Sequence, residues 1–146
     1  MKITSPVFEH NSSIPAKYTC EGSDINPPLL IQDIPGEAKE LALIVEDPDA
    51  PAGLWIHWVV YNIPITGSIE ENSIPGTQGN NTLSQPSYHG PCPPSGTHRY
   101  FFKIYALDEK LNLRASLSKG ALEKAMQGHI IDQAELVGLY KKSGNK

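Results

Sequence analysis

The sequence predicts a single, mainly β domain built on a large antiparallel or mixed sheet, with one or two helices at its periphery. Its 146 residues suit one hydrophobic core, because two cores of half this size would each be marginal. Short segments rich in β-branched and aromatic residues recur along the chain. Pro- and Gly-rich connections separate them, instead of the regular helices that a repeated βαβ pattern requires. We therefore treat residues 1–146 as one domain.

Six segments have this strand character, and each is short and bounded by turn-forming residues. In chain order they are residues 3–8, 27–34, 40–46, 57–63, 99–107 and 135–140. Because antiparallel neighbours need only short connections, this spacing favours an antiparallel or mixed sheet.

One helix is predicted over residues 118–130, near the C-terminal end of the chain. Leu122, Ala125, Met126 and His129 fall on one face of it at helical spacing. The serine that opens the segment is a suitable N-cap residue. We interpret the mostly apolar stripe as a surface that packs against the core.

The longest region without strand or helix signals runs from about residue 64 to residue 97. A connection of this length inside a compact domain is usually functional or disordered. Its prolines and its single aromatic residue, Tyr88, favour an ordered loop that wraps a surface, at least in its second half.

Composition argues against several classes of protein. Hydrophobic residues make up 39% of the chain and charged residues 19%, with 13 prolines and 12 glycines, which suits a folded protein with many fixed turns. The net charge of −4 and the lack of a Lys/Arg cluster argue against nucleic acid as a partner. No apolar run is long enough for a transmembrane segment, and residues 1–10 lack the apolar core of a signal peptide, so we expect a cytoplasmic protein.

The two cysteines, Cys20 and Cys92, are far apart in the sequence, and neither belongs to a CxxC pair. A four-cysteine zinc site is therefore excluded. Reduced thiols or packing residues are the favoured interpretation, and a single disulfide between them stays open.

Residues 46–51 read EDPDAP, which places three carboxylates within four positions. Alternation along the preceding strand puts Asp47 at the end of an apolar row. Pro48 and Pro51 restrict the backbone on either side of Asp49, so the turn has few accessible conformations. We expect Asp49 to point away from Asp47 and to support the turn.

Two later strands each open with a histidine that heads a largely apolar row. His57 is predicted to share a face with Val59, and His98 to share a face with Tyr100. If both strands neighbour the one that ends in Asp47, these polar side chains converge on one pocket.

Several kinds of site fit such a cluster. Each histidine can be a hydrogen-bonded residue at a strand end with no further role. Two histidines and Asp47 also match the ligand set of a non-haem iron or catalytic zinc site, although no HxH, HxD or HExxH spacing supports it. Asp47 and Asp49 do not suit a hydrolytic pair, and neither a GxSxG motif nor an activating partner for Cys92 indicates a nucleophile.

The remaining interpretation is an anion pocket. Histidines near an aspartate are biased towards the imidazolium form. Two such rings, the Tyr100 hydroxyl and loop N–H groups can together bind a phosphate or a carboxylate.

Two stretches of the sequence resemble the signature blocks of the phosphatidylethanolamine-binding protein family, also called the Raf kinase inhibitor protein family. They are LALIVEDPDAPAGLWIHWVVYNIP (41–64) and YHGPCPPSGTHRYFFKIYALD (88–108). The small bacterial and archaeal branch of the family is also similar to residues 18–29 and 129–142. The resemblance covers nearly the whole chain, and its motifs are highly specific in combination.

The resemblance implies a β-sandwich around a large central sheet, with a small pocket at one edge that accepts phosphate, acetate or phospholipid-like head groups. It implies no cofactor. Carried over residue by residue, the ligand-binding residues are Asp47, His57, His98, Tyr100, Gly90 and Pro94. Trp55 and Asp49 are implied as supports, beside Pro48 and Pro51 of the turn.

We therefore expect a non-enzymatic binding protein whose pocket holds a phosphate, a carboxylate or a phospholipid head group, with a regulatory contact to another protein. An alternative function is a protease inhibitor or kinase modulator that acts through surface loops, above all the loop 64–97. A third is a metal-dependent enzyme that uses Asp47, His57 and His98. The bacterial and archaeal branch also implies a homodimer.

Overall fold

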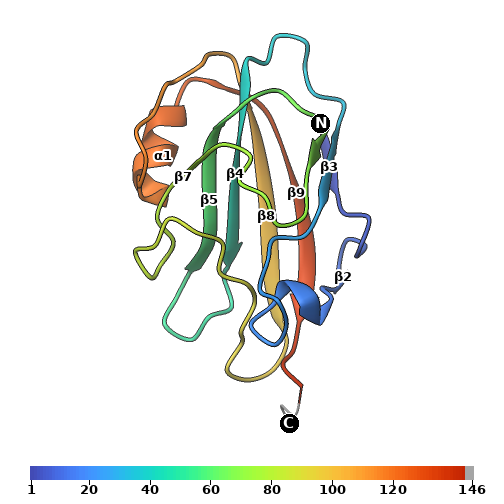
Figure 1. Ribbon diagram of the computed structural model, residues 1–146. Helices are drawn as coiled ribbons and strands as arrows, with labels where there is room; N and C mark the ends of the chain where they lie inside the picture. The colour runs from blue at the N-terminus through green and yellow to red at the C-terminus, as the bar shows by residue number, and fades with distance from the viewer. Residues whose placement is uncertain (144–146) are drawn as a thin grey trace.

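The computed structural model describes residues 1–143 and consists of two β-sheets packed face to face (Figure 1). The larger sheet has six strands in the spatial order β2-β9-β8-β4-β5-β7. These are β2 (Ser12–Ser13), β9 (Ile130–Tyr140), β8 (His98–Leu107), β4 (Glu40–Asp47), β5 (Trp55–Ile63) and β7 (Thr77–Gln78). The smaller sheet has the order β1-β3-β6, formed by β1 (Lys2–Thr4), β3 (Leu29–Gln32) and β6 (Ser68–Ile69).

The larger sheet is mixed, as the sequence predicts. β2 runs parallel to β9, while the other pairs in this sheet are antiparallel. β9 begins at Ile130 rather than at residue 135, because it pairs with β8 along nearly the whole length of that strand. The sequence pattern misses this part of β9 because most of its side chains lie outside the core.

The main hydrophobic core fills the space between the two sheets. The smaller sheet contributes Ile3, Leu29, Ile31 and Ile69, and the larger sheet contributes residues such as Leu43, Trp58, Tyr100 and Phe102. Each large apolar side chain that is fully removed from water stabilises the fold by about 1.5–3 kcal/mol. This burial explains why the central strands carry the near-continuous apolar runs seen in the sequence.

The helix α1 (Lys119–Met126) covers the opposite face of the larger sheet (Figure 1). Leu122 and Met126 are buried in a second apolar cluster on this face, and the Ser118 hydroxyl accepts a hydrogen bond from the backbone N–H of Ala121. The helix ends four positions earlier than predicted, because the chain turns through Gly128, with φ of 81°, before β9 begins. No helix within residues 1–143 is long and apolar enough to cross a membrane.

The long connection 64–97 is ordered by hydrogen bonds rather than by long strands. It contains only β6 and β7, and Asn81 organises its central turn. The Asn81 side-chain oxygen accepts hydrogen bonds from the backbone N–H groups of Leu83 (2.9 Å) and Gln85 (3.1 Å), while its amide donates to the Ser87 carbonyl (3.0 Å). The prediction of an ordered loop is therefore confirmed.

The favoured prediction for the two cysteines was wrong. Cys20 and Cys92 form a disulfide, with their Cα atoms 5.4 Å apart. The backbone N–H of Cys20 also donates to the carbonyl of Pro91 over 3.1 Å, so the two loops are joined by a covalent bond and a hydrogen bond. Spacing in the sequence could not predict this, since the two loops meet only in the folded chain.

Candidate functional site

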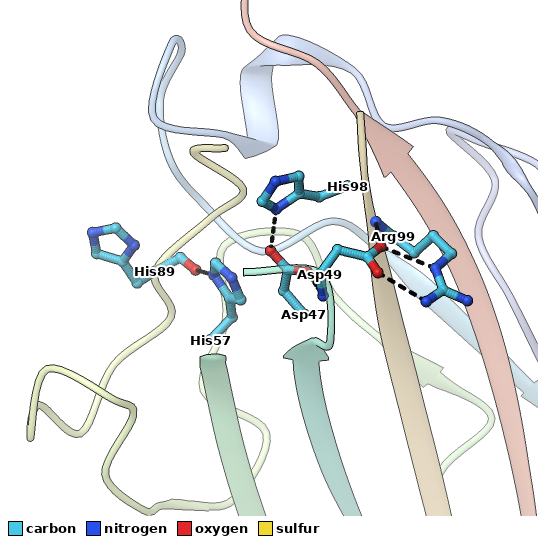
Figure 2. Close-up of polar contacts among 6 residues, drawn as sticks. All are labelled: Asp47, Asp49, His57, His89, His98 and Arg99. Carbon is cyan, nitrogen blue, oxygen red and sulfur yellow. Dashed lines mark hydrogen bonds and ion pairs between the residues drawn. The ribbon is translucent and has the colours of Figure 1, made fainter. Parts of the chain in front are cut away.

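The polar residues predicted from the sequence gather at one end of the larger sheet (Figure 2). β4 is antiparallel to both β5 and β8, so its last residue lies beside the first residues of its neighbours. Asp47 ends β4, His98 opens β8, and His57 lies near the start of β5. The predicted convergence of these three residues is thus a consequence of strand order.

Asp47 uses both of its carboxylate oxygens in this arrangement. Oδ2 lies 2.7 Å from Nδ1 of His98, and Oδ1 accepts a hydrogen bond of 2.7 Å from the backbone N–H of Asp49. Asp47 and His98 are only 3% and 6% exposed. Because Asp47 holds the Nδ1 side of the His98 ring, a further proton on this ring would be carried by Nε2.

His57 reaches the pocket because β5 contains a β-bulge. In the pairing with β4, Val45 lies opposite Trp58 and Glu46 lies opposite Ile56, which leaves His57 as the extra residue. A bulge can redirect a side chain that strict alternation would place on the other face. The prediction that His57 shares a face with Val59 was therefore wrong, since Val59 packs in the cluster beneath α1.

The opposite edge of the His57 ring is held by the loop that precedes β8. Nδ1 lies 2.5 Å from the carbonyl oxygen of His89, and the backbone N–H of His89 donates in return to the His57 carbonyl over 3.0 Å (Figure 2). A carbonyl oxygen can only accept, so Nδ1 of His57 carries the proton.

Burial keeps the His57 ring neutral. Loss of solvation lowers its pKa from 6.5 to about 4, against the opposing effects of the His89 carbonyl and of the Asp47 charge. The sequence predicted that an aspartate would favour imidazolium on neighbouring histidines, and for His57 this was wrong. Asp47 makes its contact with His98 instead, so the removal of His57 from water is the larger effect.

Tyr100 forms the floor between the two histidines. Its ring centroid lies 5.2 Å from that of His57, edge to face, and 6.4 Å from that of His98, stacked. Burial and the nearby Asp47 charge raise the pKa of its phenol, which therefore stays protonated. The hydroxyl is buried beside the backbone of Cys92 without making a well-aligned hydrogen bond, so Tyr100 positions the rings above it.

Asp49 supports the turn that follows β4, as predicted. The Asp49 carboxylate accepts hydrogen bonds from Nε (2.9 Å), Nη2 (2.8 Å) and the backbone N–H (2.9 Å) of Arg99. These bonds lower the pKa of Asp49 to about 2. Figure 2 shows Asp49 directed towards Arg99 on β8, away from the two histidines.

The cavity above these residues has a volume of about 320 Å³. Its polar floor is formed by Asp47, His57, His98, Tyr100 and His89, and its mostly apolar walls by Ala50, Pro51, Ala52, Trp55, Cys92, Pro93 and Pro94. Of the other predicted site residues, Pro48, Asp49 and Gly90 do not line it. The Gly90 backbone N–H instead donates to Oδ1 of Asp24 over 2.8 Å, behind the wall.

The pocket histidines do not form a compact metal-binding group. Among residues 1–143, one set of three possible ligands has its donor atoms within 4.8 Å of one another, and it consists of Asp108, Glu109 and His129 at the opposite end of β8. The donor atoms of Asp47, His57 and His98 do not meet this spacing. The spacing therefore suits hydrogen bonding to a small ligand better than coordination of a metal ion.

Sequence reasoning missed His89 and the bulge, and it kept the disulfide only as the less favoured alternative. His89 lies in the loop 64–97, where no periodicity indicates which way a side chain points. The only available signal was its place next to Gly90 in the YHGPCPP motif, which holds the Pro93 and Pro94 of the pocket wall.

Comparison with known proteins identifies relatives over nearly the whole chain. The family model described as phosphatidylethanolamine-binding protein matches residues 4–141. A UPF0098 protein of Chlamydia pneumoniae is 51% identical over 150 residues, covering 98% of this chain and 100% of the relative. A UPF0098 protein of Methanothermobacter thermautotrophicus is 45% identical over 150 residues, covering 97% of this chain and 99% of the relative.

Solved structures show the same architecture. The crystal structure of a putative phosphatidylethanolamine-binding protein homologue from Chlamydia trachomatis matches with a TM-score of 0.95 at 47% identity, covering 97% of both chains. The structure of Escherichia coli YbcL, described as a member of the mammalian phosphatidylethanolamine-binding protein family, matches with a TM-score of 0.88 at 27% identity. That match covers 97% of this chain and 98% of YbcL.

Proposed function

Because the chain belongs to the phosphatidylethanolamine-binding protein family, we propose that it is a non-catalytic binding protein whose pocket at Asp47, His57 and His98 holds a small anionic ligand. The ligand carries a phosphate or a carboxylate, as a free anion or as a phospholipid head group. The observation that carries this proposal is the pair of histidine Nε2 atoms. Neither Nε2 atom makes a hydrogen bond to another residue within residues 1–143. Neither is a buried atom without a partner, and both histidines line the cavity, so both Nε2 atoms are accessible from it.

The chemistry of the lining supports binding rather than catalysis. Among the described residues that form the cavity, Cys92 is in a disulfide and Tyr100 has a raised pKa, so no activated nucleophile is available. Asp47 is fully engaged by His98 and the Asp49 N–H, which suits a positioning role. The apolar walls suit a ligand in which an apolar part follows the anionic group.

Titration with inorganic phosphate, followed by NMR of the histidine rings, tests this proposal. We expect the signals of His57 and His98 to shift in a saturable manner. His129 and His10 lie outside the pocket and serve as internal controls whose signals stay in place. Unchanged His57 and His98 signals in the folded protein would contradict the proposal.

A variant sharpens this test. His98→Asn can keep the contact with Asp47 through its amide but loses Nε2, and we expect phosphate affinity to fall about tenfold or more. His129→Asn is the matched control and is expected to bind like the parent protein. If His98→Asn binds phosphate as tightly as the parent protein, and changes in the loop 64–97 abolish inhibition of a protease or modulation of a kinase, the alternative function through surface loops is favoured instead.

A further inference from the structure

The Cys20–Cys92 disulfide lies in the wall of the pocket and can be reached from solvent. Cys92 lines the cavity beside Pro93 and Pro94. It is exposed, whereas Cys20 on the facing loop is half-buried. A thiol reduces a disulfide by direct attack on one sulfur atom, so access to that atom controls the rate. Cys92 therefore provides the sulfur atom that a thiol from solvent reaches first.

The disulfide anchors a short segment that has few other contacts. We call residues 92–97 the wall segment. Within residues 1–143, residues 94–97 make no hydrogen bond to another residue, and all four are exposed. Pro93 is buried, and the Pro91 carbonyl before the segment accepts the Cys20 N–H over 3.1 Å. Without the disulfide, the wall segment is held only by Pro93 and by its two ends.

The two sheets do not use this bond for their packing. Neither Cys20 nor Cys92 belongs to the apolar clusters on the two faces of the larger sheet. The part of the loop before the wall segment has its own hydrogen bonds, since the Tyr88 hydroxyl donates to the Tyr18 carbonyl over 2.7 Å. We therefore expect reduction to loosen the wall segment and to leave the sheets folded.

We propose that the Cys20–Cys92 disulfide is a redox-exchange site, at which a dithiol reduces the folded protein and releases the wall segment of the pocket. A thiolate of the dithiol attacks Sγ of Cys92 and forms a new S–S bond, while the bond to Cys20 breaks and its Sγ leaves as a thiolate. The second thiol of the dithiol then displaces Sγ of Cys92. The dithiol is oxidised to a disulfide, and its two electrons and two protons pass to the two cysteines.

Release of the wall segment is expected to weaken binding in the pocket. The anchored segment presents Cys92, Pro93 and Pro94 to the cavity in a fixed position. A released segment has to be ordered whenever a ligand binds, which lowers the affinity by about tenfold. This consequence rests on the proposed function, whereas the exchange at Cys92 and the release of the segment do not.

Reduction of the parent protein by dithiothreitol, with and without low concentrations of urea, tests the exchange step. Free thiols are trapped with iodoacetamide and quantified by mass spectrometry. Because the free energy of unfolding falls linearly with urea, a disulfide that is reached only after unfolding is reduced much faster as urea is added. We expect the rate to change by less than about twofold below the unfolding transition. A steep rise of the rate with urea would overturn the inference.

Glutathione, a monothiol, identifies the sulfur atom that is attacked. After a brief exposure, iodoacetamide alkylates the released thiol and traps a product in which each cysteine carries a different group. We expect glutathione on Cys92 and the alkyl group on Cys20. Glutathione found chiefly on Cys20 would overturn the assignment of the attacked atom.

NMR relaxation of the oxidised and the reduced protein measures the release of the wall segment. We expect the heteronuclear ¹⁵N NOE values of residues 95–97 to fall on reduction. Gly36 and Glu37 lie in another exposed turn and serve as the control, with NOE values that stay the same. Retained signals of β4 and β8 show that the sheets are folded in both states. Unchanged NOE values in residues 95–97 would overturn the inference.

Titrations with inorganic phosphate separate this inference from the proposed function. We expect the reduced protein and the Cys20→Ser/Cys92→Ser variant to bind phosphate about tenfold more weakly than the oxidised protein. Dithiothreitol should not change binding by the variant, which controls for the reductant, and the parent comparison stands even if the variant folds poorly. Equal binding by the oxidised and the reduced protein would overturn the control of the pocket by the disulfide. Binding by neither would contradict the proposed function, and the NMR comparison then still decides whether the segment is released.

Discussion

Lowering the pH should destabilise the fold through His57. The pKa of this ring is about 4 in the folded protein, against an ordinary value of 6.5. As the pH falls, the His57 ring takes up its proton in the unfolded chain before it does so in the folded protein. The contribution of the neutral ring to the free energy of unfolding is therefore fully present above about pH 6.5 and is lost progressively towards pH 4. At about 1.4 kcal/mol per pH unit, this pKa difference corresponds to about 3 kcal/mol, of which about 2.5 kcal/mol is lost by about pH 4.5.

Urea denaturation at about pH 7.5 and about pH 4.5 measures this loss. Other groups also titrate over this range, so the informative quantity is the difference between the parent protein and His57→Asn, which has nothing to protonate at this position. We expect the variant to lose about 2.5 kcal/mol less than the parent, and His129→Asn to behave like the parent. If the parent and His57→Asn lose the same free energy of unfolding within about 0.5 kcal/mol, the reasoning about His57 is refuted.

Two further predictions concern the loop that forms the pocket wall. An added Cβ at position 90 would overlap with Oδ1 of Asp24 and with the Tyr18 carbonyl, so Gly90→Ala should destabilise the fold by about 1–3 kcal/mol. Gly36→Ala, where a Cβ meets nothing within 4 Å, is the control, and equal thermal stability of the two variants would contradict this account. The disulfide closes a loop with a sequence separation of 72 residues, so loop-closure entropy predicts a loss of about 4 kcal/mol when both cysteines are replaced by serine. A loss below about 1 kcal/mol by chemical denaturation would show that this loop is held by its hydrogen bonds instead.

The parts of the site on regular strands could be predicted from the sequence. Asp47 and His98 lie where alternation along β4 and β8 places them, because both strands run without interruption up to the pocket. The placement of His57 on the wrong face has a physical reason, since a single extra residue in β5 reverses the alternation and the sequence carries no clear mark of it.

The loop residues could not be predicted in the same way. His89 and Cys92 are placed by contacts with segments far away in the chain, namely the His57 backbone and Cys20. Such contacts join residues that are distant in the sequence, and local periodicity does not encode them. The resemblance of the motifs indicated that this loop forms the pocket wall, but not which of its atoms face the cavity.

A crystal structure of the protein grown with sodium phosphate tests the central claim most directly. We predict a tetrahedral anion on the floor above Tyr100, with one oxygen within hydrogen-bond distance of Nε2 of His57 and another within hydrogen-bond distance of Nε2 of His98. Asp47 would keep its contact with Nδ1 of His98 in this complex. A pocket that holds only water at saturating phosphate, or a metal ion coordinated by Asp47 and the two histidines, would contradict the account.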